Sequence, residues 1–439
     1  MEGAKGTNAE KLTASKLSSA VHRKPLFLVI GAGLRGTAYA SAVRREGLLA
    51  IIAAVAEPIR STRISFGKNY VWEGGAPREY QTFDSWQHFF YYERNRREAE
   101  AAGEKVYAGI YGIIVCTQDH AHKEILQALG GNSPEQTFLT GHALRYSPHN
   151  MLLRRLLLED RAIGEVISVE HTEPESVAAP SLLCMSCHDI DFILWLLCCR
   201  IDFGESAHMP SLVSSAGNQS LFTKHRKLAK LYVEKLYGKR ERDWPICFVV
   251  PVIEDITATS GTDHGRAVLT EWYGRCACES DNDVLDDQIV TLTWDDDSRA
   301  VSGEEFPGRG PKTVVFYMAS FTEAQSKRQG KISGTHREIQ YDSDEIRVYT
   351  FDKFRDPEAA KVFTPPKAGG GHDGGDGGLM NGFSQAVDAV INGKLNVEQA
   401  QAKHVGCTLK EAFMSHAMVF AAEEARLGRK IIDWMIGTG

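Results

Sequence analysis

The sequence predicts an α/β protein in which a parallel sheet precedes a mostly antiparallel sheet. Two kinds of hydrophobic pattern support this prediction. Residues 25–30 (PLFLVI), 48–56 and 111–117 (YGIIVCT) are apolar runs without alternation, separated by stretches of helical periodicity. Such runs are typical of parallel strands that helices cover on both faces. After about residue 145 the pattern alternates, which is typical of antiparallel strands with one solvent-exposed face.

This change of pattern divides the chain into two predicted domains, residues 25–143 and residues 144–439, after a polar leader at residues 1–24 that we expect to be disordered. The second domain is predicted to be an α+β domain with an open sheet. Its alternating segments are residues 166–171, 288–294, 314–321, 338–341 and 346–351. A flexible glycine-rich loop is expected at residues 369–378, and a long helix with one apolar stripe at residues 397–427.

Composition is that of a soluble globular protein. Hydrophobic residues make up 43% of the chain and charged residues 24%, and a net charge of -7 argues against nucleic acid as the main partner. No apolar run is long enough to span a membrane, so we expect no membrane partner and a cytoplasmic location. The nine cysteines are interpreted as reduced thiols. No metal is expected, because CMSC before His188 lacks a second paired-cysteine cluster.

The hexapeptide GAGLRG matches the G-x-G-x-x-G pattern of a dinucleotide-binding loop. It follows a predicted strand and opens a predicted helix, as the mechanism requires. Gly31 permits a tight turn, Gly33 lets a pyrophosphate approach the backbone, and Gly36 lets helix and strand pack closely. The helix N-terminus then attracts phosphate. The first domain is therefore predicted to be Rossmann-like. The predicted loop residues are Gly31, Ala32, Gly33, Leu34, Arg35 and Gly36.

An acidic residue ends the second predicted strand. Glu57 is placed to accept hydrogen bonds from ribose hydroxyls, which favours NAD over NADP. Arg60 and Arg63 are close enough in sequence to hold the 2′-phosphate of NADP instead. The sequence thus predicts NAD or NADP as the cofactor, with NAD slightly favoured by Glu57. A structural glycine turn beside a surface glutamate is the alternative interpretation.

Longer segments carry a resemblance to a known family. They are VIGAGLRGTAYA with VAEP, CTQDHAHKEILQAL, GHALRYSPHN followed by IGEVISVEHTEP, LLCMSCHDIDFILWL, and GGGHDGGDGGLMNGF. In this order they resemble the dinucleotide site, the T-P-x-x-x-H segment, the crossover into the second domain, the helix with a catalytic histidine and the glycine loop of the glucose–fructose oxidoreductase / inositol dehydrogenase (Gfo/Idh/MocA) family.

The resemblance implies a nicotinamide-dependent hydride transfer to or from a carbon of a sugar, polyol or cyclitol, and hence a small-molecule substrate. It implies that the open sheet forms a dimer interface, so we expect a homo-oligomer. It also implies cofactor contacts by four residues at the end of the third strand, where ligands bind in such sheets. These residues are Thr117, Gln118, His120 and His122. A capped helix start with both histidines exposed is the alternative.

The same resemblance implies that His188, in CMSCHDID, is the catalytic acid or base. Alcohol oxidation needs a base for the hydroxyl proton, and histidine serves near neutral pH. Asp191 lies three residues later and shares the helix face, so we expect it to orient the imidazole. Tyr146 and Arg145 are expected to orient the substrate. Relatives carry an acid or amine where this chain has Cys184, and a buried or capping His188 is the alternative.

A catalytic segment of the family is missing. Relatives carry a lysine in an E-K-P segment one strand after the T-P-x-x-x-H motif, but no lysine occurs between Glu124 and Thr223. The junction GGNSPEQ, residues 130–136, stands in its place, so the first sheet is expected to lack one βα unit. Further shortenings fall at residues 173–184 and 221–243.

Three hypotheses follow from this mixture of present and missing motifs. The first is an NAD(P)-dependent oxidoreductase that uses His188. The second is a dinucleotide-binding regulatory or catalytically impaired protein of the same family, because the lysine is absent. The third is a defective gene product, since a shortened sheet leaves backbone groups and apolar surface to be covered.

Overall fold

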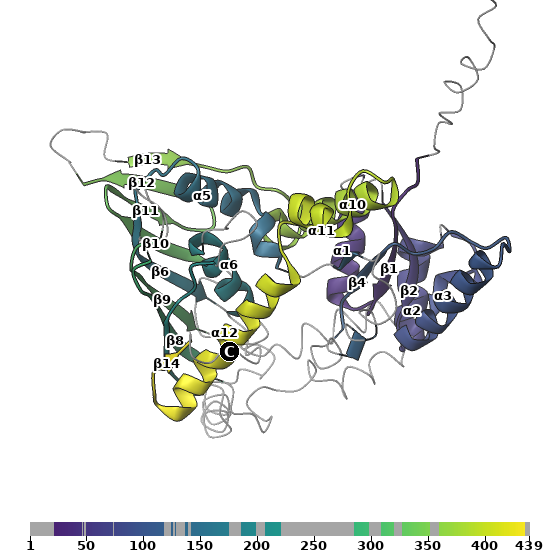
Figure 1. Cartoon of the computed structure of the whole chain (residues 1–439), viewed down its shortest axis with the longest axis horizontal. Coiled ribbons are helices and arrows are strands. Elements are labelled where there is room, and N and C mark those ends of the chain that lie inside the picture. Colours follow the sequence, from purple (N-terminus) through teal and green to yellow (C-terminus); the bar gives the residue numbers. More distant parts are fainter. Residues whose placement is uncertain are drawn as a thin grey trace, which may run out of the picture.

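The computed structural model has two lobes, each built on one sheet, with C-terminal helices between them (Figure 1). It describes residues 22–45, 47, 50–72, 74–117, 124–125, 128, 137–138, 142–174, 186–198, 207–220, 285–297, 309–319, 327–351 and 360–434. The predicted leader lies almost entirely outside these residues. Within them, no helix has the length and apolar character needed to cross a membrane.

The first sheet is parallel, with β1 at its centre between β2 and β4. In spatial order its strands are β3 (Thr82–Phe83), β2 (Ile51–Ala56), β1 (Leu26–Ile30), β4 (Gly112–Val115) and β5 (Thr137–Phe138). The strands on either side of the GGNSPEQ junction, β4 and β5, pair directly with each other. No described strand lies beyond β5. The Rossmann-like sheet is thus confirmed, and its end at β5 agrees with the predicted loss of one βα unit.

Strand β1 is buried on both faces, as its unbroken apolar run predicts. Phe27 faces a core formed with α1 (Leu34–Arg45) and α10 (Gly375–Ile391). Leu28 faces the opposite core, formed with α3 (Trp86–Ala101). The remaining helical elements of this lobe are α2 (Arg60–Phe66), η1 (Gly67–Val71) and η2 (Glu79–Gln81). Two covered faces explain why alternation is absent from these strands.

Helix α10 joins the C-terminal part of the chain to the first sheet. By sequence it falls within the predicted second domain, residues 144–439, yet its buried side packs on β1. The ring of Phe383 stacks on that of Phe27 with centroids 4.9 Å apart. The domain boundaries themselves stay a prediction, but the packing of α10 shows that the first lobe needs residues from the far end of the chain.

The second sheet has, in the described residues, the strand order β13-β12-β11-β10-β6-β9-β8-β7-β14. Every neighbouring pair is antiparallel except β6 with β9. The strands are β6 (Val166–Pro174), β7 (Leu212–Asn218), β8 (Asp287–Trp294), β9 (Lys312–Ala319), β10 (Gln329–Gly334), β11 (Arg337–Tyr341), β12 (Ile346–Thr350), β13 (Ala360–Phe363) and β14 (Ile432–Asp433). The predicted mostly antiparallel sheet is confirmed.

Among the described residues, helices cover one face of the second sheet (Figure 1). They are α5 (Pro148–Leu158), α6 (Cys187–Leu197) and α12 (Leu409–Gly428). Val290 and Leu292 of β8 are fully buried beneath them, whereas Ile289 on the other face is 43% exposed. This alternation is what period-two strands give when one face meets the core and the other meets solvent.

The prediction of one long helix at residues 397–427 is wrong. The stretch consists of α11 (Val397–Ala400), η9 (Gln401–Val405) and α12. Gly406 has a φ of 67° and ends the first helical piece. The hydroxyl of Thr408 then accepts a hydrogen bond from the Glu411 N–H, while the Glu411 carboxylate accepts from the Thr408 N–H. A left-handed glycine followed by a capping box starts a new helix, although the apolar stripe continues.

Replacing Phe383 by Ala should lower the free energy of unfolding by about 3–5 kcal/mol, because loss of a fully buried ring leaves a cavity. Urea denaturation measures the change. Phe420→Ala is the matched control, since its ring is 60% exposed, and should change the same free energy by less than about 0.5 kcal/mol. Equal effects of the two substitutions would contradict the contact between α10 and β1.

Candidate dinucleotide and substrate sites

The glycine-rich loop connects β1 to α1 with the geometry that its sequence predicts. Gly31 has a φ of 90°, and a Cβ on it would lie 2.6 Å from the Cys116 carbonyl oxygen. A Cβ on Gly36 would lie 2.2 Å from the Gly31 carbonyl oxygen. Around Gly33, in contrast, a Cβ would meet nothing within 4 Å. The first and third glycines are therefore required by close packing, and the second borders open space.

The first turn of α1 can accept an anion. Its first intrahelical hydrogen bond runs from the Thr37 N–H to the Gly33 carbonyl oxygen, so the N–H groups before it lack helical acceptors. No acidic side chain lies in this turn, and Leu34 is 82% exposed. Free N–H groups at the positive end of a helix favour a phosphate.

Glu57, which directly follows β2, holds the loop of residues 31–36 and the start of the next segment through two hydrogen bonds. Its Oε2 accepts a hydrogen bond from the Ala32 N–H at 2.9 Å, and its Oε1 accepts from the Ile59 N–H at 2.9 Å. The side chain is buried, so Glu57 is not the surface glutamate of the alternative interpretation. Each carboxylate oxygen retains a second lone pair, which leaves it able to accept from a ribose hydroxyl.

Two arginines follow Glu57 with different environments. One guanidinium N–H of Arg63 donates to the carbonyl oxygens of Glu57 and Pro58. Arg60, the first residue of α2, is exposed. Arg60 and Arg63 therefore both lie at the strand end where a 2′-phosphate would bind. The choice between NAD and NADP stays open.

The residues predicted at the end of the third strand are only partly described. Thr117 is half-buried at the carboxyl end of β4, beside the loop, since a Cβ on Gly31 would lie 3.1 Å from its nitrogen. Gln118, His120 and His122 lie outside the described residues, so their predicted cofactor contacts stay predictions.

A polar bridge links the loop of residues 31–36 to the glycine-rich segment. Within the stretch expected to be a loop, residues 369–378, the chain forms η8 (Gly371–Gly374), and α10 begins at Gly375. Arg35 donates to Asp376 Oδ1 at 2.8 Å and to the Tyr39 hydroxyl at 2.9 Å, and His372 of η8 lies 3.0 Å from the same Oδ1. Burial alone would raise the pKa of Asp376, but hydrogen bonds from His372 and Arg35 outweigh it and lower the pKa to about 2, so Asp376 is ionised.

Helix α6 carries the predicted catalytic residues, and Asp189 in its first turn anchors Arg328. The Asp189 carboxylate accepts from the Arg328 guanidinium at 2.6 and 2.9 Å and lies 2.8 Å from His171 Nε2. Arg328 also donates to Glu173 at 2.9 Å. Burial opposes the ionisation of Asp189, but Arg328 and His171 outweigh burial and lower its pKa. Burial, and then the charge of Asp189, raise the pKa of Glu173.

The carboxylate of Asp191 bonds to Arg145, contrary to the expected orienting contact with His188. The guanidinium donates two hydrogen bonds to it, at 2.6 and 2.7 Å. Arg145 also donates to the Gly406 carbonyl oxygen and lies 3.5 Å from Glu411. Burial raises the pKa of Asp191, and the paired guanidinium opposes this shift. The helical spacing predicted that Asp191 would contact His188, but the buried Arg145 binds its carboxylate instead.

Arg145 and Tyr146 also differ from their expected role in orienting the substrate. Both belong to η3 (Ala143–Tyr146), and the Tyr146 hydroxyl donates to the carbonyl oxygen of Val405. Neither lines the cavity described below. Their hydrogen bonds attach η3 to the segment that precedes α12, so both side chains act here as structural contacts.

His188 has a different set of neighbours. Its ring centroid lies 5.5 Å from that of His142 and 6.1 Å from that of His372. Its Nδ1 is buried without a hydrogen-bond partner in the described part of the chain. Burial, followed by the charges of these two imidazoles, lowers the pKa of His188 to about 3. At neutral pH the ring is uncharged and can accept a proton.

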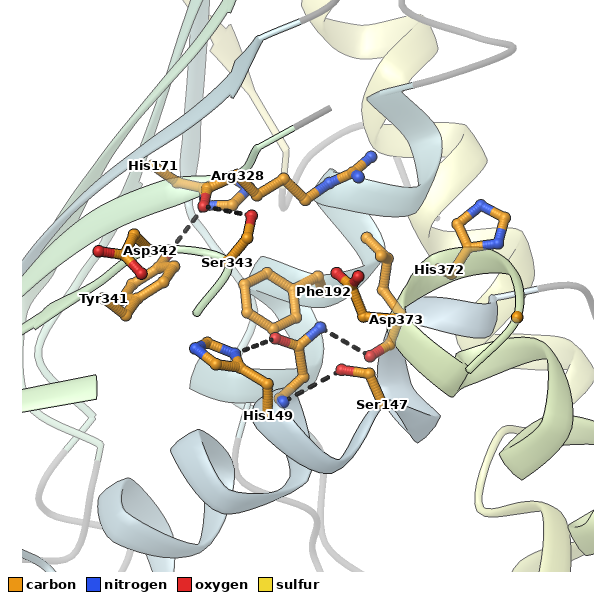
Figure 2. Close-up of a pocket in the computed structure, with 13 residues that line it drawn as sticks. Ser147, His149, His171, Phe192, Arg328, Tyr341, Asp342, Ser343, His372 and Asp373 are labelled. Carbon is orange, nitrogen blue, oxygen red and sulfur yellow. Dashed lines mark hydrogen bonds between the residues drawn. The ribbon is translucent and has the colours of Figure 1, made fainter. Parts of the chain in front are cut away.

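A cavity of about 280 Å³ lies between the second sheet and the glycine-rich loop (Figure 2). Its polar lining includes Ser147, His149, Arg328, Ser343, His372 and Asp373, and Phe192 adds an aromatic face. His372 and Asp373 have φ values of 51° and 52°. Left-handed backbone at non-glycine residues is costly and collects at functional sites. His188 does not line this cavity, but its ring centroid lies 6.1 Å from that of His372, which does.

Solved structures share this architecture. An oxidoreductase from Sinorhizobium meliloti matches with a TM-score of 0.58 at 12% identity, over 93% of this chain and 99% of its own. Levoglucosan dehydrogenase in complex with NADH and levoglucosan matches with a TM-score of 0.58 at 12% identity, over 94% and 99%. An oxidoreductase from Agrobacterium radiobacter in complex with NAD+, L-tartaric acid and magnesium matches with a TM-score of 0.56 at 10% identity, over 94% and 98%.

The chain has the two-domain fold of these oxidoreductases. This is the fold type that the resemblance to the Gfo/Idh/MocA family implies, and a myo-inositol dehydrogenase from Corynebacterium glutamicum also shares it, with a TM-score of 0.50 at 10% identity over 94% of this chain and 99% of its own. No family model and no curated protein matches the sequence. The similarity therefore establishes the fold.

Sequence reasoning missed three residues of the site. His142 lies in GHALRYSPHN, but no role was predicted for it or for Arg328, because their contacts appear only when distant segments meet. Asp376 carried a usable signal, because it is the acidic residue that follows the glycine run and opens α10. In the described residues, no group of three or more potential metal ligands comes together.

Replacing Arg145 by Met should lower the free energy of unfolding by about 3–5 kcal/mol at pH 7, because Asp191 is left as an unpaired buried charge. Without the guanidinium the pKa of Asp191 rises further above its unfolded value, so the loss shrinks as the pH falls and the carboxyl takes up a proton. Urea denaturation at pH 7 and pH 5 measures this. The double substitution Arg145→Met with Asp191→Leu should recover most of the loss, and an unaffected single variant would contradict the pair.

Proposed function

We propose that the protein is an NAD(P)-dependent oxidoreductase that transfers a hydride to or from the alcohol or carbonyl carbon of a sugar, polyol, cyclitol or related small metabolite. The observation that carries this proposal is the glycine loop, which is open at Gly33 and fastened by the buried Glu57 carboxylate. Such a loop serves a dinucleotide, and levoglucosan dehydrogenase, which shares the fold, is complexed with NADH.

The residues around the loop fit a dinucleotide. The backbone of residues 31–36 would hold the pyrophosphate, and Glu57 would accept from the ribose hydroxyls. Arg60 and Arg63 leave NADP as an alternative to NAD. Thr117, with Gln118, His120 and His122, would lie near the nicotinamide, which supplies or accepts the hydride when the cofactor is bound.

His188 is the proposed acid or base. Its neutral imidazole lies beside His372, which lines the cavity, and a neutral imidazole can take the hydroxyl proton of an alcohol. The cavity volume lies near the small end of the range for ligand pockets, about 300–1,000 Å³, which suits a small metabolite. Hydroxyl, imidazole and carboxylate groups in its lining can bind several hydroxyls of one substrate.

A second candidate is a dinucleotide-binding protein without turnover. The specific observation that favours it is the missing lysine, because residues 124–223 contain none. A measurement of substrate turnover distinguishes the oxidoreductase from the binding protein. The oxidoreductase reduces NAD(P) with at least one polyol or cyclitol, and His188→Ala abolishes the reduction without loss of dinucleotide binding.

Gly33→Ala should weaken dinucleotide binding at least about tenfold and leave the thermal midpoint unchanged, because the added methyl meets only the space that the pyrophosphate needs. Quenching of NADH and NADPH fluorescence by titrated protein measures the affinity. Gly393→Ala serves as control for binding, since it also meets no atom within 4 Å and lies far from the loop; its φ of 68° strains an alanine and should lower the thermal midpoint, but dinucleotide binding should not change. If the unchanged protein bound neither dinucleotide, both candidate functions would fail.

The open face of the second sheet is the proposed dimer interface. Val315 is 39% exposed beside Tyr317, which pairs across the strands with Ile289. Lys331 adds ion pairs with Glu170 and Glu338 at the edge of this apolar centre. An apolar centre with a charged rim is the composition of protein interfaces.

Val315→Arg should convert a dimer to a monomer, because it places a charge at the centre of that face. Sedimentation velocity measures the mass. Tyr91→Arg on α3, whose ring is 59% exposed in the first lobe, should leave the mass unchanged. A dimer that tolerates Val315→Arg would place the interface elsewhere.

A further inference from the structure

His142 is the least expected residue of the site. It ends the TFLTGH segment, just before η3, and is 3% exposed. Its ring lies 5.5 Å from His188 of α6 and 5.7 Å from His416 of α12. The two contacts are edge-on, with interplanar angles of 75° and 63°. Three histidines from different parts of the chain therefore meet in one row, in which His142 is buried and His188 and His416 are half-buried.

The nitrogens of this row are incompletely paired. His142 Nδ1 is buried without a hydrogen-bond partner, and the Asp191 carboxylate lies 3.8 Å from it. His188 Nδ1 is buried and without a partner as well. His416, in contrast, hydrogen-bonds through its Nδ1 to the Ala412 carbonyl oxygen. Buried polar atoms without partners are rare and call for a reason, and here two occur on neighbouring rings.

We propose that His142 is the proton partner of His188. The inference rests on the proposed oxidoreductase function and deepens it. His142 acts through His188 and is a positioning residue, because it lines neither the cavity nor the dinucleotide loop.

The proton count balances. With a nicotinamide dinucleotide bound, the cofactor would take the hydride from the substrate carbon, and the hydroxyl proton would go to His188 Nε2. The two Nδ1 atoms do not hydrogen-bond to each other in this structure, so a rotation of one ring, or one water between them, would carry the proton already on His188 Nδ1 to His142 Nδ1. His188 ends neutral with its proton on Nε2, and His142 becomes an imidazolium beside the Asp191 carboxylate. Reduction runs the same steps backwards.

The surrounding charges suit a shared proton. Burial first, and then the Arg145 and His416 charges, lower the pKa of His142 to about 3, which matches the value for His188. Glu411 and Asp191 face the same ring from α12 and α6. A single imidazole with so low a pKa is a weak base, and a second acceptor of equal pKa behind it draws the proton onward at little cost in free energy.

The test is the titration of His188 by nitrogen-15 NMR on full-length protein with labelled histidines, without cofactor or substrate. In the unchanged protein, His142 and His188 should titrate together in two coupled steps. His142→Phe keeps the ring volume but removes the proton acceptor, so His188 should titrate in one step with its pKa shifted by about one unit or more. His142→Gln should give the same result. His416→Phe, the matched control, should leave the coupled titration of His188 in place.

Kinetics give the second readout. With a substrate that turns over, His142→Phe should lower kcat at least about tenfold, move the pH limb of kcat and leave KM unchanged. An identical titration of His188 in the unchanged protein and in a folded His142→Phe or His142→Gln variant would overturn the proposal, as would unaltered kcat. Coupled titration without turnover on any substrate would instead reject the oxidoreductase function and keep the histidine pair.

Discussion

The buried ion pair between Arg145 and Asp191 sets the geometry of the candidate site. Arg145 comes from the crossover between the sheets and Asp191 from α6, and the same guanidinium holds the Gly406 carbonyl oxygen ahead of α12. Taking two charges out of water is costly, and only a two-point hydrogen-bonded geometry offsets the cost. His142 lies three residues before Arg145 and His188 three before Asp191, so the pair fixes the distance between the two imidazoles.

A second polar connection joins the two halves of the site. Asp376 accepts hydrogen bonds from Arg35 with both carboxylate oxygens, and its Oδ1 also lies within hydrogen-bonding distance of His372. His372 borders the cavity and contacts His188. A displacement of Arg35 would therefore act on His372 through a single carboxylate. The glycines on either side of Asp376 lie in α10, which packs closely there, since a Cβ on Gly375 would lie 2.2 Å from the Ala143 carbonyl oxygen.

Sequence patterns predicted most of the fold, because they report local physics. Unbroken apolar runs and alternating runs distinguished the two sheets, and GAGLRG with Glu57 located the loop and the acid that fastens it. The prediction of one long helix at residues 397–427 was wrong because the apolar stripe continues past Gly406. Hydrophobic periodicity does not reveal that one residue has a left-handed backbone. Strands β7, β10 and β13 were missed for lack of a clear alternation.

The site was harder to predict, because its contacts join residues far apart in the chain. Helical spacing paired Asp191 with His188, and nothing local indicated that Arg145 would take the carboxylate. No role was predicted for Arg328 or for His142 of GHALRYSPHN, because they contact Asp189 and His188, which lie elsewhere in the sequence. The resemblance indicated His188, but not its contact with His142.

The packing of α10 on β1 has a consequence for how the chain is made. Domains generally fold as units, from the N-terminus, while the chain is synthesised. Here the core beneath Phe27 is completed by Phe383, so this face of the first sheet is covered by α1 without α10 until nearly the whole chain has emerged. Such a long-range contact slows folding and prolongs the exposure of apolar surface. Truncation near the C-terminus would then damage the first lobe, at the opposite end of the chain.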